Sequence, residues 1–257
     1  MVRSWDNCYT KGLLRIKLNK ILVNNNDIKN DLLNYHFVNN KSIKVIGFPQ
    51  YNLKSTFNFY SLGEVKSYLG LKKQKYIVFC PGGSQLTNLD QKIYDDLRDL
   101  LNNDFSIVVR NHPGHPSSVQ TKSDDIIQKD FFHKYSEKPN KYCDFNKLDN
   151  MFYMYILNYA EFIVSVASSV VIDSLFLKKK QIIANYNENE NKINRYLNEE
   201  HMAKFIKSEA AFVAKNKKDL ELFINLESNS LKINVEHNRR FNIKTDFNIN
   251  LLNNLSK

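Results

Sequence analysis

The sequence predicts an α/β fold with a doubly wound parallel sheet. Three observations support this fold class. Short, continuous apolar runs typical of buried parallel strands recur along the chain. Segments with apolar residues at helical spacing lie between these runs. The chain has 257 residues, of which 42% are hydrophobic and 25% charged, so it can bury a sizeable core. Strands that alternate with helices in this way form parallel sheets.

The first fifty residues predict a strand, a helix and a second strand. The first strand is expected at 20–26 and the helix at 27–37, where isoleucine and leucine recur at helical spacing. The second strand is expected at 42–49, and Gly47 and Pro49 end it. This order indicates a βαβ unit or the end of one domain.

The rest of the chain predicts a second series of elements. Residues 50–74 are mixed and polar, which predicts a linker with a short helix around 62–70. Four further strands are expected, at 76–80, 105–110, 161–166 and 180–186. Helices are expected at 89–103, 151–160 and 168–178. From residue 188 onward the pattern is mostly helical.

The chain carries a formal net charge of +10. A basic surface suits nucleic acid, an anionic membrane or phosphorylated small molecules. The alternative is a compositional bias toward lysine, since Asn, Lys and Ile are all abundant. No basic run is interleaved with aromatic residues, so we expect no nucleic-acid partner. An RNA-binding role is kept as a distant alternative, which would give strongly salt-dependent binding.

The cysteines indicate a reducing compartment. Cys8, Cys80 and Cys143 are odd in number and far apart, which favours neither a disulfide framework nor a zinc site. The first twelve residues contain no apolar segment typical of a signal peptide. The longest apolar stretch, 162–177, is too short to span a bilayer. We therefore expect a cytoplasmic protein, with membrane association at the inner face as a further option.

Three loops are expected to meet at the carboxyl edge of the sheet, where open α/β sheets bind ligands. The first is "CPGGSQ" at 80–85. Gly82 and Gly83 let backbone N–H groups approach a ligand closely, and Ser84 before a helix suits a phosphate. No GK[ST] follows, so this is not a P-loop. The alternative is an ordinary strand-to-helix turn.

The second loop is "RNHPGHP" at 110–116. Arg110 and His112 can both donate hydrogen bonds to phosphate oxygens, and Pro113 would hold His112 in place. A metal pair of His112 and His115 is disfavoured, because the prolines exclude helical geometry and no third ligand is near. We therefore expect no metal. The alternative is a surface-loop histidine.

The third loop lies within "SVASSVVID" at 165–173. Ser168 or Ser169 is expected to cap a helix whose first N–H groups would face an anion. Asp173, in that helix, could accept hydrogen bonds from a ribose. The alternative is a serine that only begins the helix. Together the second and third loops predict an anion site sized for a diphosphate.

These residues resemble the C-terminal nucleotide-binding half of GT-B glycosyltransferase-like proteins. The likeness is to the group with CDP-glycerol glycerophosphotransferases and surface-polysaccharide transferases. That group has an R-x-HP motif after one strand and an SS…E motif at a later helix. The matching residues here are Arg110, His112, Pro113, Ser168, Ser169 and Asp173. Asp173 in place of glutamate departs from the pattern. "SWDN…TKG", "KILVNN" and "VIGFPQYN" also resemble the end of the first domain and the crossover.

The resemblance implies a Rossmann-like half of a GT-B fold with a truncated N-terminal domain. Residues 1–60 would be the remnant of that domain and the crossover, and 61–257 the donor-binding domain. The implied activity is transfer of a sugar or polyol phosphate from a nucleotide-activated donor to a glycan or lipid-linked acceptor. Arg110, His112 and the serine cap would stabilise charge on the leaving diphosphate, with no metal or resident cofactor.

Two other functions stay open from the sequence. A UDP-sugar 2-epimerase shares the architecture but would need more carboxylates in its cleft. A non-catalytic nucleotide-sugar-binding fragment is the second. A full GT-B enzyme has two such domains, about 350 residues or more. The acceptor site and the usual base would then lie upstream, so the chain is expected to be a fragment, a split gene product or a reduced relative. Whether it is an enzyme is left open.

Overall fold

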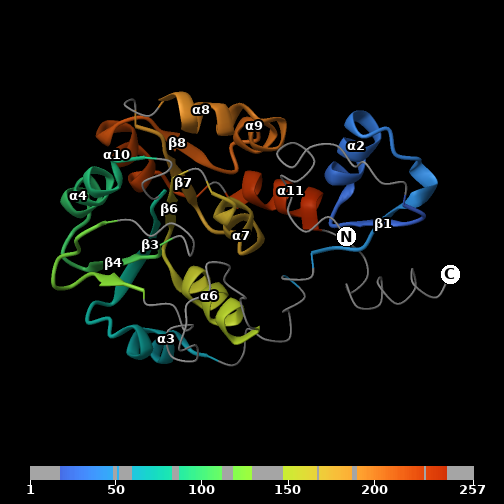
Figure 1. Cartoon of the computed structure of the whole chain (residues 1–257). Helices are drawn as coiled ribbons and strands as arrows, with labels where there is room; N and C mark the ends of the chain where they lie inside the picture. The colour runs from blue at the N-terminus through green and yellow to red at the C-terminus, as the bar shows by residue number, and fades with distance from the viewer. Residues whose placement is uncertain are drawn as a thin grey trace. The chain divides into compact units, whose positions relative to one another are not determined.

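The chain divides into two compact units in the computed structural model (Figure 1). The smaller unit combines Met1–Ser55 with Asn234–Lys257, and the larger unit is Thr56–Ile233. The structure describes residues 18–48, 51, 60–82, 87–111, 118–128, 147–166, 168–186, 190–228 and 230–241, except the side chains of 147–150, 190–192 and 200–201. That residues 1–60 derive from a larger domain stays a prediction.

The larger unit contains a sheet of six strands, all paired in parallel. They are β3 (Lys75–Cys80), β4 (Phe105–Val109), β5 (Ile126–Ile127), β6 (Ile163–Ser165), β7 (Gln181–Ala184) and β8 (Phe212–Ala214). Their order across the sheet is β5-β4-β3-β6-β7-β8. The chain thus builds outward from β3 in one direction and from β6 in the other. This order confirms the doubly wound parallel sheet, with its switch point between β3 and β6.

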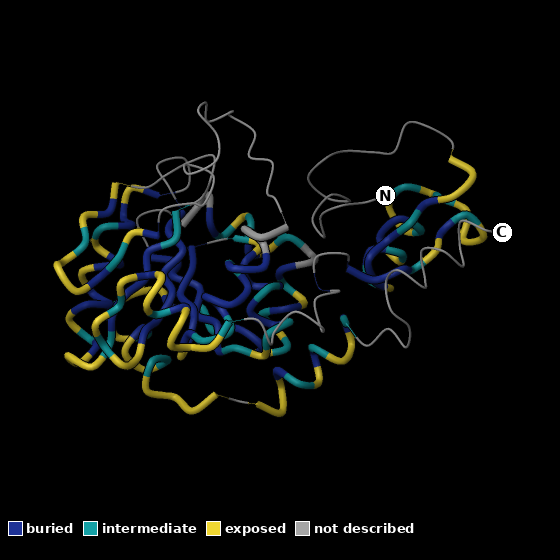
Figure 2. Tube along the Cα trace, turned by 90° about the horizontal axis from the view of Figure 1, so that it is seen from below, coloured by how far each residue is buried: buried dark blue, intermediate teal, exposed yellow. Residues whose placement is uncertain are grey.

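Helices cover both faces of this sheet. They are α3 (Leu62–Leu69), α4 (Asp90–Leu100), α6 (Lys147–Tyr159), α7 (Val170–Phe176), α8 (Glu190–Asn198), α9 (Glu200–Lys207) and α10 (Lys217–Asn225). Helices α3, α6 and α7 lie on one face, and α4 and α10 lie together on the other (Figure 1). Because both faces are covered, consecutive strand residues such as Ile77, Val78 and Phe79 are all fully buried. Figure 2 shows the strands as the buried centre of this unit.

Two short strands differ from the sequence-based expectation. The edge strand β5 was not predicted, and β8 lies in the tail that was expected to be mostly helical. Strands of two or three residues are too short to show a period, and each pairs with only one neighbour. The predicted helix near 62–70 is confirmed as α3. Ser61 and Glu64 form a capping box at its start, and Gly70 ends it in the left-handed conformation.

The smaller unit contains a βαβ segment, as the sequence predicted. Strands β1 (Ile21–Val23) and β2 (Ile43–Val45) pair in parallel. Helix α2 (Asn26–Tyr35) and the short 3-10 helix η1 (Asn40–Ser42) connect them. Asn25 caps α2 by accepting a hydrogen bond from the N–H of Ile28 at 3.0 Å.

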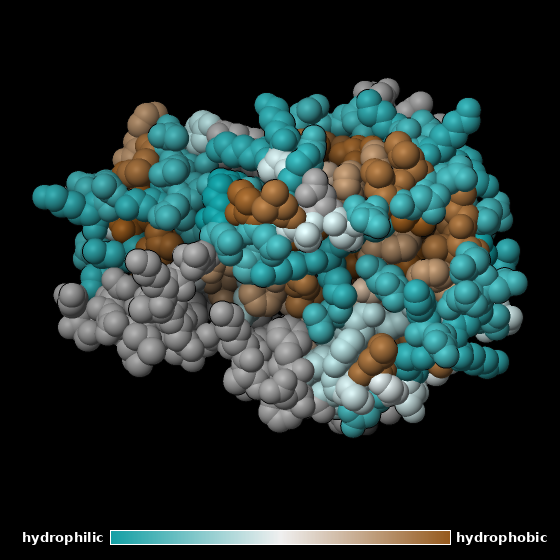
Figure 3. Space-filling view, turned by 180° about the vertical axis from the view of Figure 1, so that it is seen from behind, coloured by the Kyte–Doolittle hydropathy of each residue, from teal (hydrophilic) through white to brown (hydrophobic). Residues whose placement is uncertain are grey.

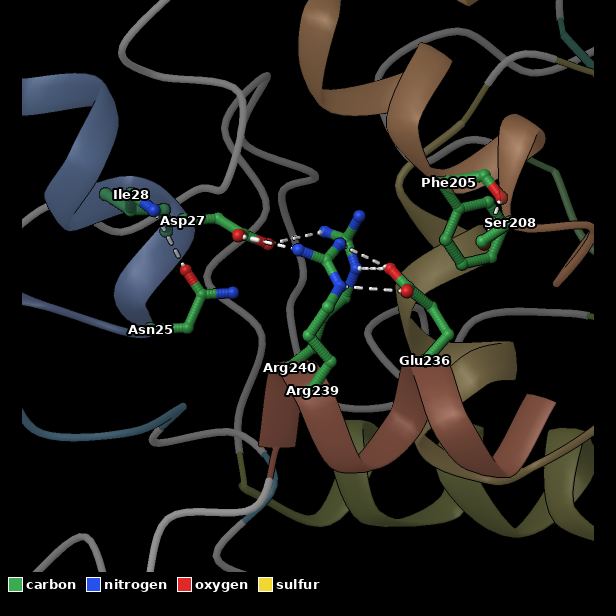
Figure 4. Close-up of polar contacts among 8 residues, drawn as sticks. All are labelled: Asn25, Asp27, Ile28, Phe205, Ser208, Glu236, Arg239 and Arg240. Atoms are coloured by element: carbon green, nitrogen blue, oxygen red, sulfur yellow. Dashed lines mark hydrogen bonds and ion pairs between the residues drawn. The ribbon is translucent and has the colours of Figure 1, made fainter. Parts of the chain in front are cut away.

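The last helix, α11 (Ser230–Phe241), ends in the smaller unit and is held there by charge. Arg239 lies 2.8 Å from Asp27 of α2, although 212 residues separate them along the chain. Arg239 and Arg240 both donate to Glu236, at 2.6 Å each. Figure 4 shows the two guanidinium groups between Asp27 and Glu236. The network joins the two ends of the chain within one unit.

On the face shown in Figure 3, most of the described side chains are hydrophilic, with apolar side chains exposed between them. The exposed apolar residues include Phe37, Leu222, Leu231 and Val235. Scattered exposure of this kind is ordinary for a folded protein. Within the described ranges, no helix combines the length and the apolarity needed to cross a bilayer.

A buried ion pair fixes the segment that leads to β5. Asp125 accepts hydrogen bonds from Arg98 at 2.9 Å, Tyr94 at 2.6 Å and the N–H of Ile107 at 2.7 Å. The side chains of Arg98 and Asp125 are 8% and 0% exposed. Arg98 also donates to the carbonyls of Phe105 and Asn102. This network ties helix α4, strand β4 and the approach to β5 together.

We expect Asp125→Asn to lower the free energy of unfolding by about 3 kcal/mol, because it leaves Arg98 buried without its counter-charge. Urea denaturation followed by circular dichroism measures this loss. The control is Asp124→Asn, next along the chain, whose solvent-accessible carboxylate pairs with Lys73 and should contribute less than about 1 kcal/mol. Equal losses in both variants would contradict the assignment.

We expect Glu236→Gln to loosen the smaller unit, since Arg239 and Arg240 lose a shared counter-charge. Amide exchange in α2 should accelerate by about tenfold or more, while Glu221→Gln on the exposed face of α10 changes nothing there.

Burial alone would raise the pKa of the Glu236 carboxyl, but hydrogen bonds and charge from the two arginines outweigh it and lower that pKa. The stabilisation is therefore complete above the ordinary glutamate pKa, and it is lost as pH falls through the lowered value. Protection factors in α2, which correct for the intrinsic pH dependence of amide exchange, that stay constant on acidification would contradict this account.

Candidate functional site

The candidate site lies at the carboxyl ends of β4, β3 and β6, which are neighbours in the sheet. The N–H of Arg110 donates to the carbonyl of Phe79 at 2.8 Å, and the N–H of Val166 donates to the carbonyl of Cys80 at 3.1 Å. These bonds hold the residues that follow β4 and β6 on either side of the end of β3. The switch point of the sheet is therefore flanked by the two segments that carry the predicted site residues.

Arg110 is positioned by two side chains that come from different elements. Its Nη1 donates to Oε1 of Gln128 at 3.0 Å, and its guanidinium lies 4.1 Å from the centre of the Tyr153 ring. Gln128 follows β5, and its N–H donates to the carbonyl of Val109 at 2.9 Å. Tyr153 lies on α6. The guanidinium is half-buried and is held at the strand end by an amide and an aromatic ring.

Asp173 belongs to the same cluster. The Tyr153 hydroxyl donates to Oδ2 of Asp173 at 2.8 Å, and Asp173 lies in the first turn of α7. Arg110 and Asp173, which the sequence placed in two separate loops, are thus linked through one tyrosine. The resulting series of contacts runs from Gln128 to Arg110, Tyr153 and Asp173.

Burial and nearby charge keep the Tyr153 hydroxyl and the Cys80 thiol protonated at neutral pH. Burial first, and then the charge of Asp173, raise the pKa of Tyr153 well above its ordinary value, so its hydroxyl stays protonated and donates. Burial raises the pKa of the Cys80 thiol to about 12, with Arg110 lowering it and Asp173 raising it. Both charges therefore act on the end of β3, and Cys80 offers no thiolate at neutral pH.

The first glycine of the predicted phosphate loop is already engaged. Gly82 is buried, and its N–H donates to Oδ1 of Asp90 at 2.9 Å. Asp90 is the first residue of α4, so this bond fixes the turn from β3 into the helix. Gly83 and Ser84 lie outside the described residues, and so does His112.

The serine pair sits at the start of α7, with little capping. Ser169 is the N-cap residue and is exposed, but its hydroxyl makes no capping hydrogen bond. The Ser168 hydroxyl accepts a long hydrogen bond, 3.4 Å, from the N–H of Val170. Helix α7 has only 7 residues. The structure therefore brings Arg110 and Asp173 together more firmly than it engages the two serines.

Sequence reasoning missed Tyr153 and Gln128. Tyr153 lies in an apolar, aromatic run that reads as a core helix, and nothing in its spacing separates it from Tyr155 or Tyr159. Gln128 follows a two-residue strand that the sequence did not predict. Among the described residues, no three or more histidine, cysteine or acidic side chains gather in a way that could hold a metal ion.

The sequence matches no protein-family model and no curated protein. Solved structures do match. A variant of the wall teichoic acid polymerase TagF soaked with CDPG aligns with a TM-score of 0.62 at 16% identity, over 91% of this chain and 55% of that one. A second TagF structure has the same TM-score and covers 57% of its chain.

Two further structures match less well. UDP-GlcNAc 2-epimerase from Methanocaldococcus jannaschii, in complex with UDP-GlcNAc and UDP, has a TM-score of 0.50 at 14% identity, over 82% of this chain and 56% of that one. The S. aureus MnaA–UDP structure has the same TM-score at 12% identity, over 87% and 56%. The chain spans little more than half of these proteins, and it has the predicted fold, a Rossmann-like half of a GT-B architecture.

Proposed function

We propose that this chain binds a nucleotide-activated donor at the carboxyl edge of its large sheet and serves transfer of a sugar or polyol phosphate to a surface-glycan acceptor. One observation carries the proposal. A half-buried arginine, Arg110, is held beside the switch point, and Tyr153 links it to the carboxylate of Asp173. A cation and a carboxylate on one edge suit a ligand that has phosphates at one end and hydroxyl groups at the other.

Arg110 is the group suited to the phosphates. In sugar transfer a nucleoside diphosphate leaves, and in polyol-phosphate transfer a nucleoside monophosphate leaves. In both reactions negative charge grows on nucleotide phosphate oxygens as the bond breaks. A fixed guanidinium at a half-buried position stabilises that charge more than it would in water. His112, two residues along the chain, is proposed as a second donor.

Asp173 is the group suited to the ribose. A carboxylate can accept up to about four hydrogen bonds, so Asp173 can receive a ribose hydroxyl beside its bond from Tyr153. Ser168 and Ser169 are at the start of the same helix and are proposed to approach the phosphates. Gly83 and Ser84 are proposed to border the donor from the loop after β3.

The structural comparisons support a nucleotide ligand and favour the transferase over the epimerase. The TagF structures align at TM-scores of up to 0.62, and one of these two was soaked with CDPG, whereas the UDP-GlcNAc 2-epimerase structure aligns at 0.50. An epimerase-like function would also use a UDP-sugar at the same edge. The acceptor is proposed to be a glycan or a lipid-linked glycan, and the net charge of +10 is compatible with contact to an anionic membrane.

We expect Arg110→Gln to weaken nucleotide binding by about 10- to 100-fold, because a charge-assisted contact to phosphate is lost. A thermal-shift screen against CDP, UDP, GDP and CMP measures it, since a ligand that binds the native state raises stability. His112→Ala should also reduce the shift. Arg195→Gln, which removes an exposed arginine on α8, is the charge-matched control. No stabilisation of the wild type by any nucleotide would remove the proposal.

We expect Asp173→Asn to lower affinity for the preferred ribonucleotide by about tenfold. The hydrogen bond from the ribose hydroxyl is weaker when a neutral amide replaces the charged carboxylate as its acceptor. Affinity for the matching 2′-deoxynucleotide should change little. Calorimetric titration of both ligands gives the ratio of the two affinities. An equal loss for the ribo and deoxy forms would mean that Asp173 does not contact the ribose.

A further inference from the structure

Tyr153 contacts both charged groups of the candidate site, and it does so with two different parts of its side chain. Its ring lies 4.1 Å from the Arg110 guanidinium, and its hydroxyl donates to Asp173 at 2.8 Å. The ring contact is an attraction between a cation and a π face, and it keeps the guanidinium over the ring. The hydroxyl contact is a directional bond that fixes the carboxylate rotamer. The two can therefore be removed separately.

The helix that carries Tyr153 is fixed in the core, so the ring cannot drift. Phe152, Met154, Tyr155 and Ile156 of α6 are buried against the sheet and its neighbours. The hydroxyl of Tyr76 on β3 donates to the carbonyl of Ile156 at 2.8 Å, which ties α6 to the central strand. A tyrosine has only two side-chain torsions, so a fixed backbone leaves its hydroxyl little freedom.

Gln128 completes the fixation of Arg110. It accepts from Nη1 at 3.0 Å, while its own backbone N–H is bonded to the end of β4. The guanidinium is therefore held by the ring of Tyr153 and the amide of Gln128. Asp173, by contrast, is joined to this cluster through the hydroxyl of Tyr153. Tyr153 is thus a described side chain that contacts both the cation and the carboxylate.

We propose that Tyr153 is a positioning residue that sets the spacing between the phosphate-binding Arg110 and the ribose-binding Asp173, and so makes the site select ribonucleoside diphosphates. This inference rests on the proposed function. A nucleoside diphosphate joins its anionic and hydroxyl-bearing parts through a short linkage, so both ends bind best when the two protein groups keep a separation that this linkage can span. If Asp173 is displaced, the ligand loses its contact to the ribose and keeps its contact to the phosphates. The ratio of the affinities for the ribonucleotide and the 2′-deoxynucleotide measures this loss.

Two variants separate the contacts. Tyr153→Phe keeps the ring beside Arg110 and removes the hydroxyl that orients Asp173. We expect it to reduce the preference for CDP over 2′-deoxy-CDP from about tenfold to about twofold, with 2′-deoxy-CDP affinity nearly unchanged. Tyr153→Leu removes both contacts, so 2′-deoxy-CDP affinity should also fall by about fivefold or more. A purely structural role would lower stability without changing the ratio.

The matched control is Tyr159→Phe. Tyr159 is on the same helix, and its hydroxyl donates to the carbonyl of Tyr60 at 2.7 Å. It lies in the last turn of α6, which precedes β6, so it is at the opposite end of the helix from the carboxyl edge. This variant loses a tyrosine hydrogen bond of similar length and should keep the wild-type ratio of affinities. Circular dichroism melts of all three variants report whether each one folds. If Tyr153→Leu does not fold, the comparison of Tyr153→Phe with Tyr159→Phe tests the inference without it.

The experiment titrates the full chain with CDP and 2′-deoxy-CDP, or with the corresponding UDP or GDP pair if that base stabilises the wild type more. A ratio that collapses in Tyr153→Phe and persists in Tyr159→Phe supports the inference. Wild-type binding with a ribo preference that all variants retain would overturn the inference and leave the proposed function standing. Wild-type binding without a ribo preference would also overturn it. No wild-type binding to any of the nucleotides would remove both.

Discussion

The pairing of β3 with both β4 and β6 is the constraint on which the rest of the larger unit depends. Because β3 is central and the chain reverses its direction of growth there, the segments after β4 and β6 must leave the sheet on either side of Cys80. Hydrogen bonds from Arg110 and Val166 to the last residues of β3 express this directly. The candidate site is thus a consequence of strand order. Side-chain identity decides only what this edge of the sheet can bind.

Two arginines in this unit show how burial separates structure from function. Arg98 is almost fully buried, and its partners are Asp125 and the carbonyls of Phe105 and Asn102. Breaking such a buried pair is strongly destabilising, and its charges are already satisfied by protein groups, so it is poorly suited to bind a ligand. Arg110 is half-buried at a strand end, where a ligand can reach it. The first network also serves the second, because Asp125 fixes the segment that delivers Gln128 to Arg110.

The sequence predicted the elements whose burial produces a regular apolar pattern. It did not predict the short strands or the contacts that depend only on the three-dimensional arrangement. The runs at 76–80 and 105–110 are apolar because helices cover both faces of the sheet, and β3 and β4 appear there as predicted. Strands β5 and β8 are too short to carry a period. Arg110 and Asp173 were predicted because they lie in or just after loops expected at the carboxyl edge of the sheet, where open α/β sheets bind ligands. Tyr153 was missed, since an aromatic residue in an apolar helix has the same signature whether it packs in the core or orients a charge.

Under the proposed function, the described residues favour side chains over backbone groups for phosphate recognition. Doubly wound sheets commonly bind phosphates with glycine-loop N–H groups and a helix N-terminus. Here the Gly82 N–H is bonded to Asp90. The first three N–H groups of the short α7 already donate to Ser168 or Ser169. A helix end contributes about half an elementary charge, whereas Arg110 contributes a full one at a position fixed by Tyr153 and Gln128. Under the proposed function, the fidelity of this site is therefore set by how rigidly its arginine is held, and α6, which carries no predicted site residue, is the element that holds it.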